Sequence, residues 1–131
     1  MEFRLDNASG VAPYRQLADQ VRQALRLGIL EPGDQLPTVR EVVASIAINP
    51  NTVLKAYREL EREGLAEGRP GQGTFILRSL SSASPSDQLR LKKRLAAWLA
   101  EARRSGVDED GIRALVDSVL HERDGTVEDI A

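Results

Sequence analysis

Two short amphipathic segments, separated by only three residues, constrain the fold of this chain more than any other feature. Apolar residues recur at helical spacing from position 39 to 46 and again from position 53 to 60. Residues 47–49 separate the two expected helices. Two short helices joined by a turn of three or four residues form a helix-turn-helix, so the sequence predicts this motif.

Signals for helix starts support the same assignment. Thr38 and Glu41 have the spacing of a capping box, in which each side chain bonds the backbone N–H of the other residue. Asn49 followed by Pro50 has the residue types of an N-cap and a first helical position. A further helical pattern covers residues 13–28, which begin with proline and end with glycine. The sequence therefore predicts three helices before residue 65.

A glycine-rich hairpin is expected directly after these helices. Residues 65–67 and 74–77 have the composition of short strands, and residues 68–73 between them contain three glycines and a proline. A hairpin in this position is the wing of a winged helix-turn-helix. Residues 3–5, in which two apolar residues flank an arginine, suggest a small additional edge strand.

The C-terminal part of the chain predicts two more helices. Apolar residues mark a helix over residues 85–104 and another that Asp108 caps. Two amphipathic helices in about 45 residues cannot enclose a core alone, and symmetric dimers are the commonest oligomers. We therefore expect these helices to pair with a second copy. The expected dimer interface consists of Leu95, Trp98, Leu99, Ile112, Leu115, Val116 and Val119.

The predicted fold class is mainly α with a small β-hairpin. A length of 131 residues suits one small domain with an appendage. We assign residues 1–78 to a winged helix-turn-helix DNA-binding domain, the serine-rich residues 79–86 to a linker, and residues 87–131 to a helical dimerisation segment.

Composition excludes several classes of function. The chain has no cysteine and one histidine, which rules out disulfide scaffolds, thiolate metal sites and thiol nucleophiles. No apolar run approaches the ~20 residues of a membrane helix, and the first six residues are too polar for a signal peptide. We expect a cytoplasmic protein without metal, cofactor, membrane contact or enzymatic activity.

Net charge gives no support to nucleic-acid binding, so that function depends on the placement of individual residues. The chain has 18 basic and 20 acidic residues, and residues 1–78 contain ten of each. In a helix-turn-helix, however, the first turns of the second helix face the DNA bases, and here those turns are polar. We predict DNA contacts from Thr38, Arg40, Asn49, Asn51, Thr52, Lys55, Arg69, Gly71 and Gly73.

The chemistry of these residues suits DNA, and structural explanations also exist for them. Asparagine bonds adenine, arginine bonds guanine or phosphate, and free N–H groups at helix starts bind phosphates. Thr38 and Asn49, however, also have the types of helix caps, and Gly71 and Gly73 also shape a turn. The alternating arginines and glutamates of residues 58–63 are equally typical of solvated ion pairs.

Several spaced motifs, taken in order, resemble the N-terminal winged helix of the GntR family of bacterial transcription regulators. The resemblance covers about half of the chain and is carried by residues 13–17, 28–41, 49–53, 56–65 and 71–75. It implies DNA contacts at Arg40, Asn49, Asn51, Thr52 and the wing glycines. Many members have arginine at the positions of Pro50 and Leu54, so the contact set implied here is poorer in arginine.

The start of the third helix and the short C-terminal segment look like the YtrA-type subfamily. In that subfamily a pair of C-terminal helices forms the dimer, and members often repress their own operons, which include ABC transporter genes. The sequence leaves open whether a small-molecule effector exists. An effector would bind between the C-terminal helices or in a groove near the wing.

The leading hypothesis is a homodimeric repressor that binds an inverted-repeat operator in double-stranded DNA. The alternative is a winged-helix module that contacts proteins and does not bind DNA specifically. Zero net charge in residues 1–78 favours this alternative slightly, whereas the polar start of the third helix argues against it.

Overall fold

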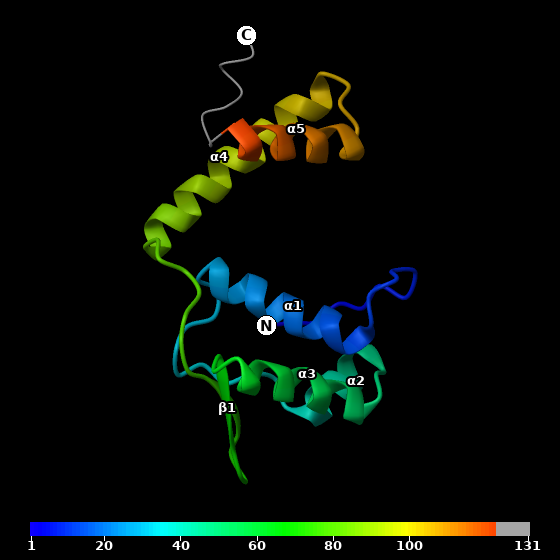
Figure 1. The fold of residues 1–131 in the computed structure, drawn as a ribbon, viewed down its shortest axis with the longest axis vertical. Helices are drawn as coiled ribbons and strands as arrows, with labels where there is room; N and C mark the ends of the chain where they lie inside the picture. Colours follow the sequence, from blue (N-terminus) through cyan, green and yellow to red (C-terminus); the bar gives the residue numbers. More distant parts are fainter. Residues whose placement is uncertain (123–131) are drawn as a thin grey trace. The chain divides into compact units, whose positions relative to one another are not determined.

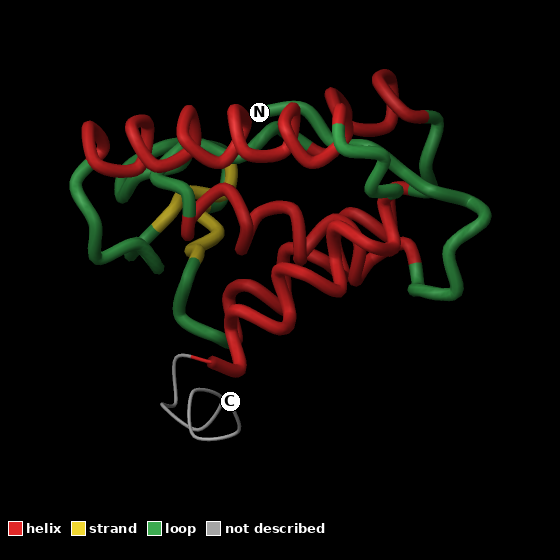
Figure 2. The backbone as a smooth tube through the Cα atoms, turned by 90° about the horizontal axis from the view of Figure 1, so that it is seen from above, coloured by secondary structure: helices red, strands yellow, loops and turns green. Residues whose placement is uncertain are grey.

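Five α-helices and one two-stranded sheet make up the part of the chain that the computed structural model describes, residues 1–122 (Figure 1). The predicted fold class is confirmed, and the strands within residues 1–122 form one short hairpin (Figure 2). The chain divides into two units, residues 1–88 and 89–131. The elements are α1 (Pro13–Arg26), α2 (Val39–Ile46), α3 (Pro50–Arg62), β1 (Ala66–Arg69), β2 (Gly73–Ile76), α4 (Pro85–Arg104) and α5 (Glu109–Glu122).

The helix starts form as the sequence predicts. Thr38 caps α2 in a complete capping box: its Oγ1 accepts from the Glu41 N–H at 3.1 Å, and Glu41 Oε1 accepts from the Thr38 N–H at 2.9 Å. Asn49 caps α3, with Pro50 at the first helical position. Between α2 and α3, Ala47 has a left-handed backbone conformation with φ of 51°. This residue reverses the chain within the short turn of the helix-turn-helix.

The core of the first unit lies mainly between α1 and α3. Helix α3 buries one stripe, of which Val53 and Leu60 are completely inaccessible. Helix α1 buries Leu17, Val21 and Leu25 to the same extent. Burying such a side chain stabilises a fold by about 1.5–3 kcal/mol. The short α2, whose β-branched residues have weak helix propensity, buries Val42 in the same core.

Tyr57 links this core to the start of α2. Its ring is buried near Phe3, with 6.5 Å between ring centroids, and its hydroxyl donates to the Pro37 carbonyl at 2.5 Å. Burial raises the pKa of Tyr57, and the nearby Glu41 carboxylate adds to this effect. The hydroxyl group therefore remains a donor and fixes the residue directly before the Thr38 cap.

The expected edge strand at residues 3–5 is wrong, because the side chain of Gln20 occupies the place of a neighbouring strand. Gln20 Oε1 accepts from the Arg4 N–H at 2.9 Å, and its Nε2 donates to the Arg4 carbonyl at 2.6 Å. Phe3 is buried in the core, so the segment is held without a β-ladder.

The wing is an antiparallel hairpin in which Ala66 pairs with Ile76 and Arg69 pairs with Gly73. Both strands extend closer to the turn than the sequence predicts, which reduces the connection to residues 70–72. The hairpin projects beyond α3 in Figure 1. It follows α3 directly, in the position expected of a wing.

An ion-pair cluster joins α1 to the end of α3. The Arg22 guanidinium bonds the Glu63 carboxylate, lies 3.5 Å from Glu59 and bonds Asp19 at 2.7 Å. The hydrogen bond with Glu63 raises the pKa of Arg22, and the same bond lowers the pKa of Glu63. Arg22 of α1 thus neutralises part of the negative charge that Glu59 and Glu63 place at the end of α3.

Serine-rich residues lead from the wing into α4. Leu80 packs against the core of the first unit, and Gln88 Nε2 donates to the Arg26 carbonyl at 3.0 Å. Helix α4 begins at Pro85, which lies inside the segment that the sequence assigns to the linker. The start of α4 is therefore tied to the end of α1.

The second unit contains the rest of α4 and α5. Asp108 Oδ1 accepts from the Gly111 N–H at 2.8 Å, which confirms the predicted cap of α5. Ala102 and Ile112 are the buried apolar residues among the described part of this unit. The predicted dimerisation segment continues to residue 131, and residues 123–131 lie outside the described part. No helix within residues 1–122 has the length and apolar character needed to cross a membrane.

We expect Tyr57→Phe to lower the thermal stability of the protein. The variant keeps the ring but leaves the Pro37 carbonyl without its donor, a loss of about 1–2 kcal/mol. In a domain of this size each kcal/mol lowers Tm by about 4–8 °C. Thermal unfolding followed by circular dichroism measures the effect. Tyr14→Phe, which removes the hydroxyl of a partly exposed tyrosine, is the control, and an equal Tm shift in both variants would contradict the role of Tyr57.

Candidate nucleic-acid interface

The first turn of α2 presents a cation beside a capped helix start. Arg40 is exposed at the second position of α2, directly after Thr38 and Val39. The two hydrogen bonds to Thr38 lower the pKa of Glu41, the backbone bond contributing more. Glu41 is already bound in the cap of α2. Arg40 is therefore the charged side chain of this turn that is available to contact a ligand. Its guanidinium has the geometry for guanine or phosphate.

The first turn of α3 presents polar side chains around its cap. Asn49 Oδ1 accepts from the Asn51 N–H at 2.8 Å. Asn51 enters this cap through its backbone, and its side chain is exposed. Thr52 is half-buried one position further along. Asn49 thus has the structural role that its residue type allows, while Asn51 has a side chain available to a base edge.

Lys55 has an intramolecular partner that sequence reasoning missed. Its Nζ lies 4.1 Å from the centroid of the Tyr14 ring on α1, the geometry of a cation–π contact. Lys55 remains exposed. No local pattern could have indicated this pair, because Tyr14 and Lys55 come together only when α1 packs against α3.

The wing holds Arg69 in a defined position. Its guanidinium carbon lies 4.4 Å from the centroid of the Phe75 ring, and its Nε donates to Glu67 Oε2 at 3.1 Å. Gly71, with φ of 75°, has open space where a side chain would begin. The backbone at the wing tip is therefore accessible to a surface that approaches it closely.

The structure brings Thr38 together with the predicted wing residues. A shallow groove of about 610 Å³ has Thr38 on one side and residues 68–74 on the other, which include Arg69, Gly71 and Gly73. A smaller depression of about 240 Å³ extends from Thr38 and Thr74 to Arg58 of α3. The start of α2, the wing and α3 thus border adjoining grooves.

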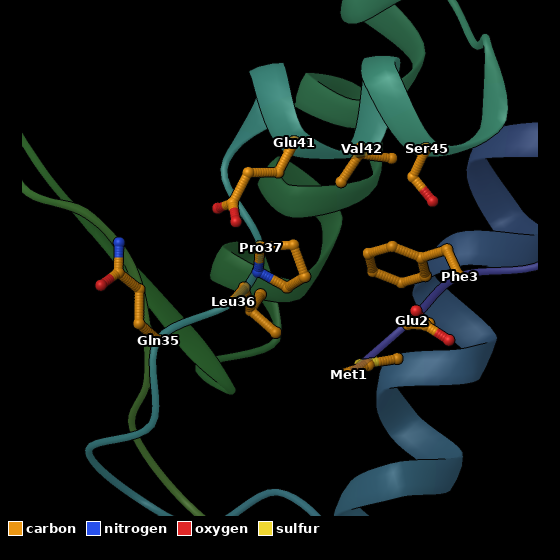
Figure 3. Close-up of a pocket in the computed structure, with 9 residues that line it drawn as sticks. All are labelled: Met1, Glu2, Phe3, Gln35, Leu36, Pro37, Glu41, Val42 and Ser45. Atoms are coloured by element: carbon orange, nitrogen blue, oxygen red, sulfur yellow. The ribbon is translucent and has the colours of Figure 1, made fainter.

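A separate cavity of about 430 Å³ lies on another side of α2 (Figure 3). Its apolar lining comes from Phe3, Leu36 and Val42, and its polar lining includes Glu41 and Ser45. This cavity shares Pro37 with the smaller depression and contains none of the predicted DNA contacts.

The predicted dimer residues differ in how much surface they offer. Ile112 is only 8% exposed, and Trp98 and Leu99 are half-buried within their own unit. The other four are exposed. Their exposed fractions are 52% for Leu95, 44% for Leu115, 41% for Val116 and 63% for Val119.

A helix-turn-helix followed by a hairpin, with polar helix starts and a wing beside them, defines a winged helix-turn-helix DNA-binding domain. Residues 13–76 match the sequence model described as "Bacterial regulatory proteins, gntR family". The chain belongs to the GntR family, and its similarity is to the YtrA type.

One relative and one solved structure of this type match most of the chain, and a second relative matches about half of it. It is 37% identical over 107 residues to the HTH-type transcriptional repressor YtrA of Bacillus subtilis, covering 81% of this chain and 82% of the relative. It is 51% identical over 63 residues to the uncharacterised regulator YhcF of the same organism, covering 48% of this chain and 52% of the relative. The solved structure of YtrA from Sulfolobus acidocaldarius matches with a TM-score of 0.53 and 29% identity, covering 92% and 97% of the two chains. These relatives are transcriptional regulators, a role that is not enzymatic.

The geometry of the α3 cap gives Asn49 and Asn51 different roles. Asn49 caps the helix, whereas the side chain of Asn51 is available for DNA recognition. We expect Asn49→Ala to destabilise the protein by about 1 kcal/mol, because a helix cap is lost. Asn51→Ala removes an exposed side chain and should change stability by less than about 0.5 kcal/mol. Urea unfolding of both variants measures the difference. Equal stability of the two variants would contradict the assignment of Asn49 as the cap.

Proposed function

We propose that this protein is a repressor that binds an inverted-repeat operator as a homodimer. The observation that carries the proposal is that α2 and α3 both begin with exposed polar residues, and that the start of α2 borders the wing groove through Thr38. A helix-turn-helix inserts the start of its second helix into the major groove. Membership of the GntR family and similarity to a named repressor support this reading.

Each predicted contact has a chemical role in the proposal. Arg40 and Asn51 read base edges, since both side chains are exposed and form bidentate bonds to guanine and adenine. Thr52 contacts a base edge or a thymine methyl group. The remaining residues hold the DNA backbone through N–H groups, hydroxyls and charge. They are Thr38, Asn49, Lys55, Arg69, Gly71 and Gly73.

The absence of net positive charge is compatible with this role because several acids are already paired. Glu63 and Asp19 are bound to Arg22 on α1, at the end of α3 remote from its first turn. Glu41 is bound in the cap of α2. The first turn of α2 contributes Arg40 and the second turn of α3 contributes Lys55, and both of these cations are exposed.

Dimerisation is proposed to use the second unit. Two helices bury little surface between them, and an exposed apolar set on α4 and α5 remains to be covered. In a two-fold symmetric dimer, the exposed apolar residues of each copy cover those of the other. The same symmetry places the two copies of α3 on the two half-sites of the operator. In this arrangement residues 1–78 bind DNA, residues 79–86 link, and residues 87–131 form the dimer.

Repression would be steric, through occupation of a promoter. Resemblance to the YtrA type points to autoregulation of an operon with transporter genes, and the duplex upstream of the protein's own gene is therefore the first probe. Fluorescence anisotropy compares it with a scrambled duplex of equal length at two salt concentrations. Salt-sensitive preference for the native duplex is expected. Binding without preference would favour the alternative of a protein-interaction module.

In the same assay we expect Arg40→Ala to weaken specific binding by about 1–3 kcal/mol, the value of one bidentate base contact. Arg62→Ala is the control, because Arg62 is an exposed arginine in the last turn of α3. A loss of the same size in both variants would show a general effect of charge. Unchanged discrimination by Arg40→Ala would exclude Arg40 from base recognition.

We expect Val119→Asp to dissociate the dimer without unfolding the chain. Val119 is 63% exposed in the single chain, so a carboxylate there is tolerated by the folded monomer. It destabilises the dimer, because association would bury the charge. Trp98 is a poorer choice, because it is half-buried in its own unit. Ser118→Asp adds the same charge 100° around α5 and is the control. Analytical ultracentrifugation reports the mass, and a dimeric Val119→Asp protein would contradict the proposed interface.

A further inference from the structure

The wing is supported by a third segment of chain, residues 33–36, which run beside β2. The Gly33 N–H donates to the Ile76 carbonyl and the Ile76 N–H donates to the Asp34 carbonyl, both at 2.8 Å. The Leu36 N–H donates to the Thr74 carbonyl, also at 2.8 Å. The same segment continues through Pro37 into the cap of α2. The segment that pairs with β2 therefore leads directly into the first turn of α2.

One side chain of this segment reaches the tip of the wing. Gln35, which pairs with Phe75 through an isolated β-bridge, extends its amide group along the hairpin. Its Nε2 donates to the carbonyl of Gln72 at 3.1 Å. Gln72 closes the turn, since its N–H donates to the Arg69 carbonyl at 2.9 Å. Gln35 thus bonds the loop residue that completes the wing turn.

The backbone at the wing tip is shaped to admit this amide group. Gly73, with φ of 126°, lies so close to Gln35 that a Cβ atom at Gly73 would meet its Nε2 at 2.4 Å. Pro70 and Gly71 occupy the second and third positions of the turn, where a type II turn takes these residues, and Gly71 has φ of 75°. Gly73 therefore has a structural reason for lacking a side chain, separate from any contact with DNA.

We infer that Gln35 is a positioning residue that holds the wing tip at a fixed distance from the first turn of α2. This inference rests on the proposed function, because the wing tip and Thr38 face each other across the groove assigned to DNA. Gln35 itself is exposed, and its backbone pairing does not depend on its side chain. Losing the amide group leaves the β-ladder intact but frees the turn. Binding DNA would then have to order the wing, which lowers affinity.

Gln35→Met tests the inference, since methionine has a similar length and no N–H donor. We expect the variant to bind the operator duplex about three- to tenfold more weakly, the effect of losing one hydrogen bond. Combination with Arg69→Ala separates positioning from a general structural effect. In that background, where the wing has already lost its cation, Gln35→Met should weaken binding by less than about twofold.

The matched control is the same substitution in the Asn51→Ala background. Asn51 lies on α3 and does not depend on the wing, so the two losses of affinity should multiply. Full loss in both backgrounds would show that Gln35 acts independently of Arg69 and would overturn the inference. Affinity equal to that of the unsubstituted protein would overturn it as well.

Amide hydrogen exchange of the free protein gives a readout that needs no DNA. Gln35→Met should speed exchange at residues 69–75 while α1 and α3 keep their rates. Faster exchange at residues 69–75 with unchanged operator affinity would overturn the inference about Gln35 but leave the proposed function intact. Failure of the unsubstituted protein to prefer the operator duplex would overturn the proposed function, and this inference with it. Unchanged exchange at residues 69–75 would show that the amide bond does not hold the wing.

Discussion

The hydrogen bond from the Tyr57 hydroxyl to the Pro37 carbonyl joins the hydrophobic core of the first unit to the start of α2. Tyr57 belongs to the buried stripe of α3, whereas Pro37 belongs to the segment between α1 and α2 that pairs with the wing. One bond thus ties the hydrophobic core to the backbone that carries the Thr38 cap. Because the ring is buried and packed near Phe3, the hydroxyl has a fixed direction. This side chain therefore contributes to the placement of the start of α2 relative to α3.

Charge in this protein is organised locally. Basic and acidic residues are matched in number over residues 1–78, with ten of each, yet they are not mixed evenly in space. Arg22 gathers three carboxylates at the end of α3, and Arg69 is stacked on Phe75 and bonded to Glu67 in the wing. Such arrangements fix the directions of side chains more than they add stability, because exposed ion pairs contribute only about 0–1 kcal/mol each. An overall charge count therefore says little about any one face of the molecule.

Local patterns in the sequence were sufficient to predict much of the fold. The capping box of Thr38, the Asn49–Pro50 start and the Asp108 cap all act within one helical turn, and all are confirmed. The strand expected at residues 3–5 is wrong because Gln20, on another element, supplies the missing hydrogen bonds. The candidate site divides in the same way. Its residues lie at helix starts and in a hairpin that sequence patterns reveal, whereas the partners of Lys55 and Gln35 are brought near only by the folded chain.

The left-handed conformation of Ala47 has a consequence for how the helix-turn-helix comes into being. An alanine in this conformation costs roughly 1–2 kcal/mol, and the capped helices on either side are too short to be stable alone. The neighbouring Ile48 is buried, so the turn is stabilised by the same core that α1 completes. Helices α2 and α3 therefore do not form an autonomous folding unit. The part of the chain with the most specific task acquires its shape cooperatively, together with a helix that contributes none of the predicted DNA contacts.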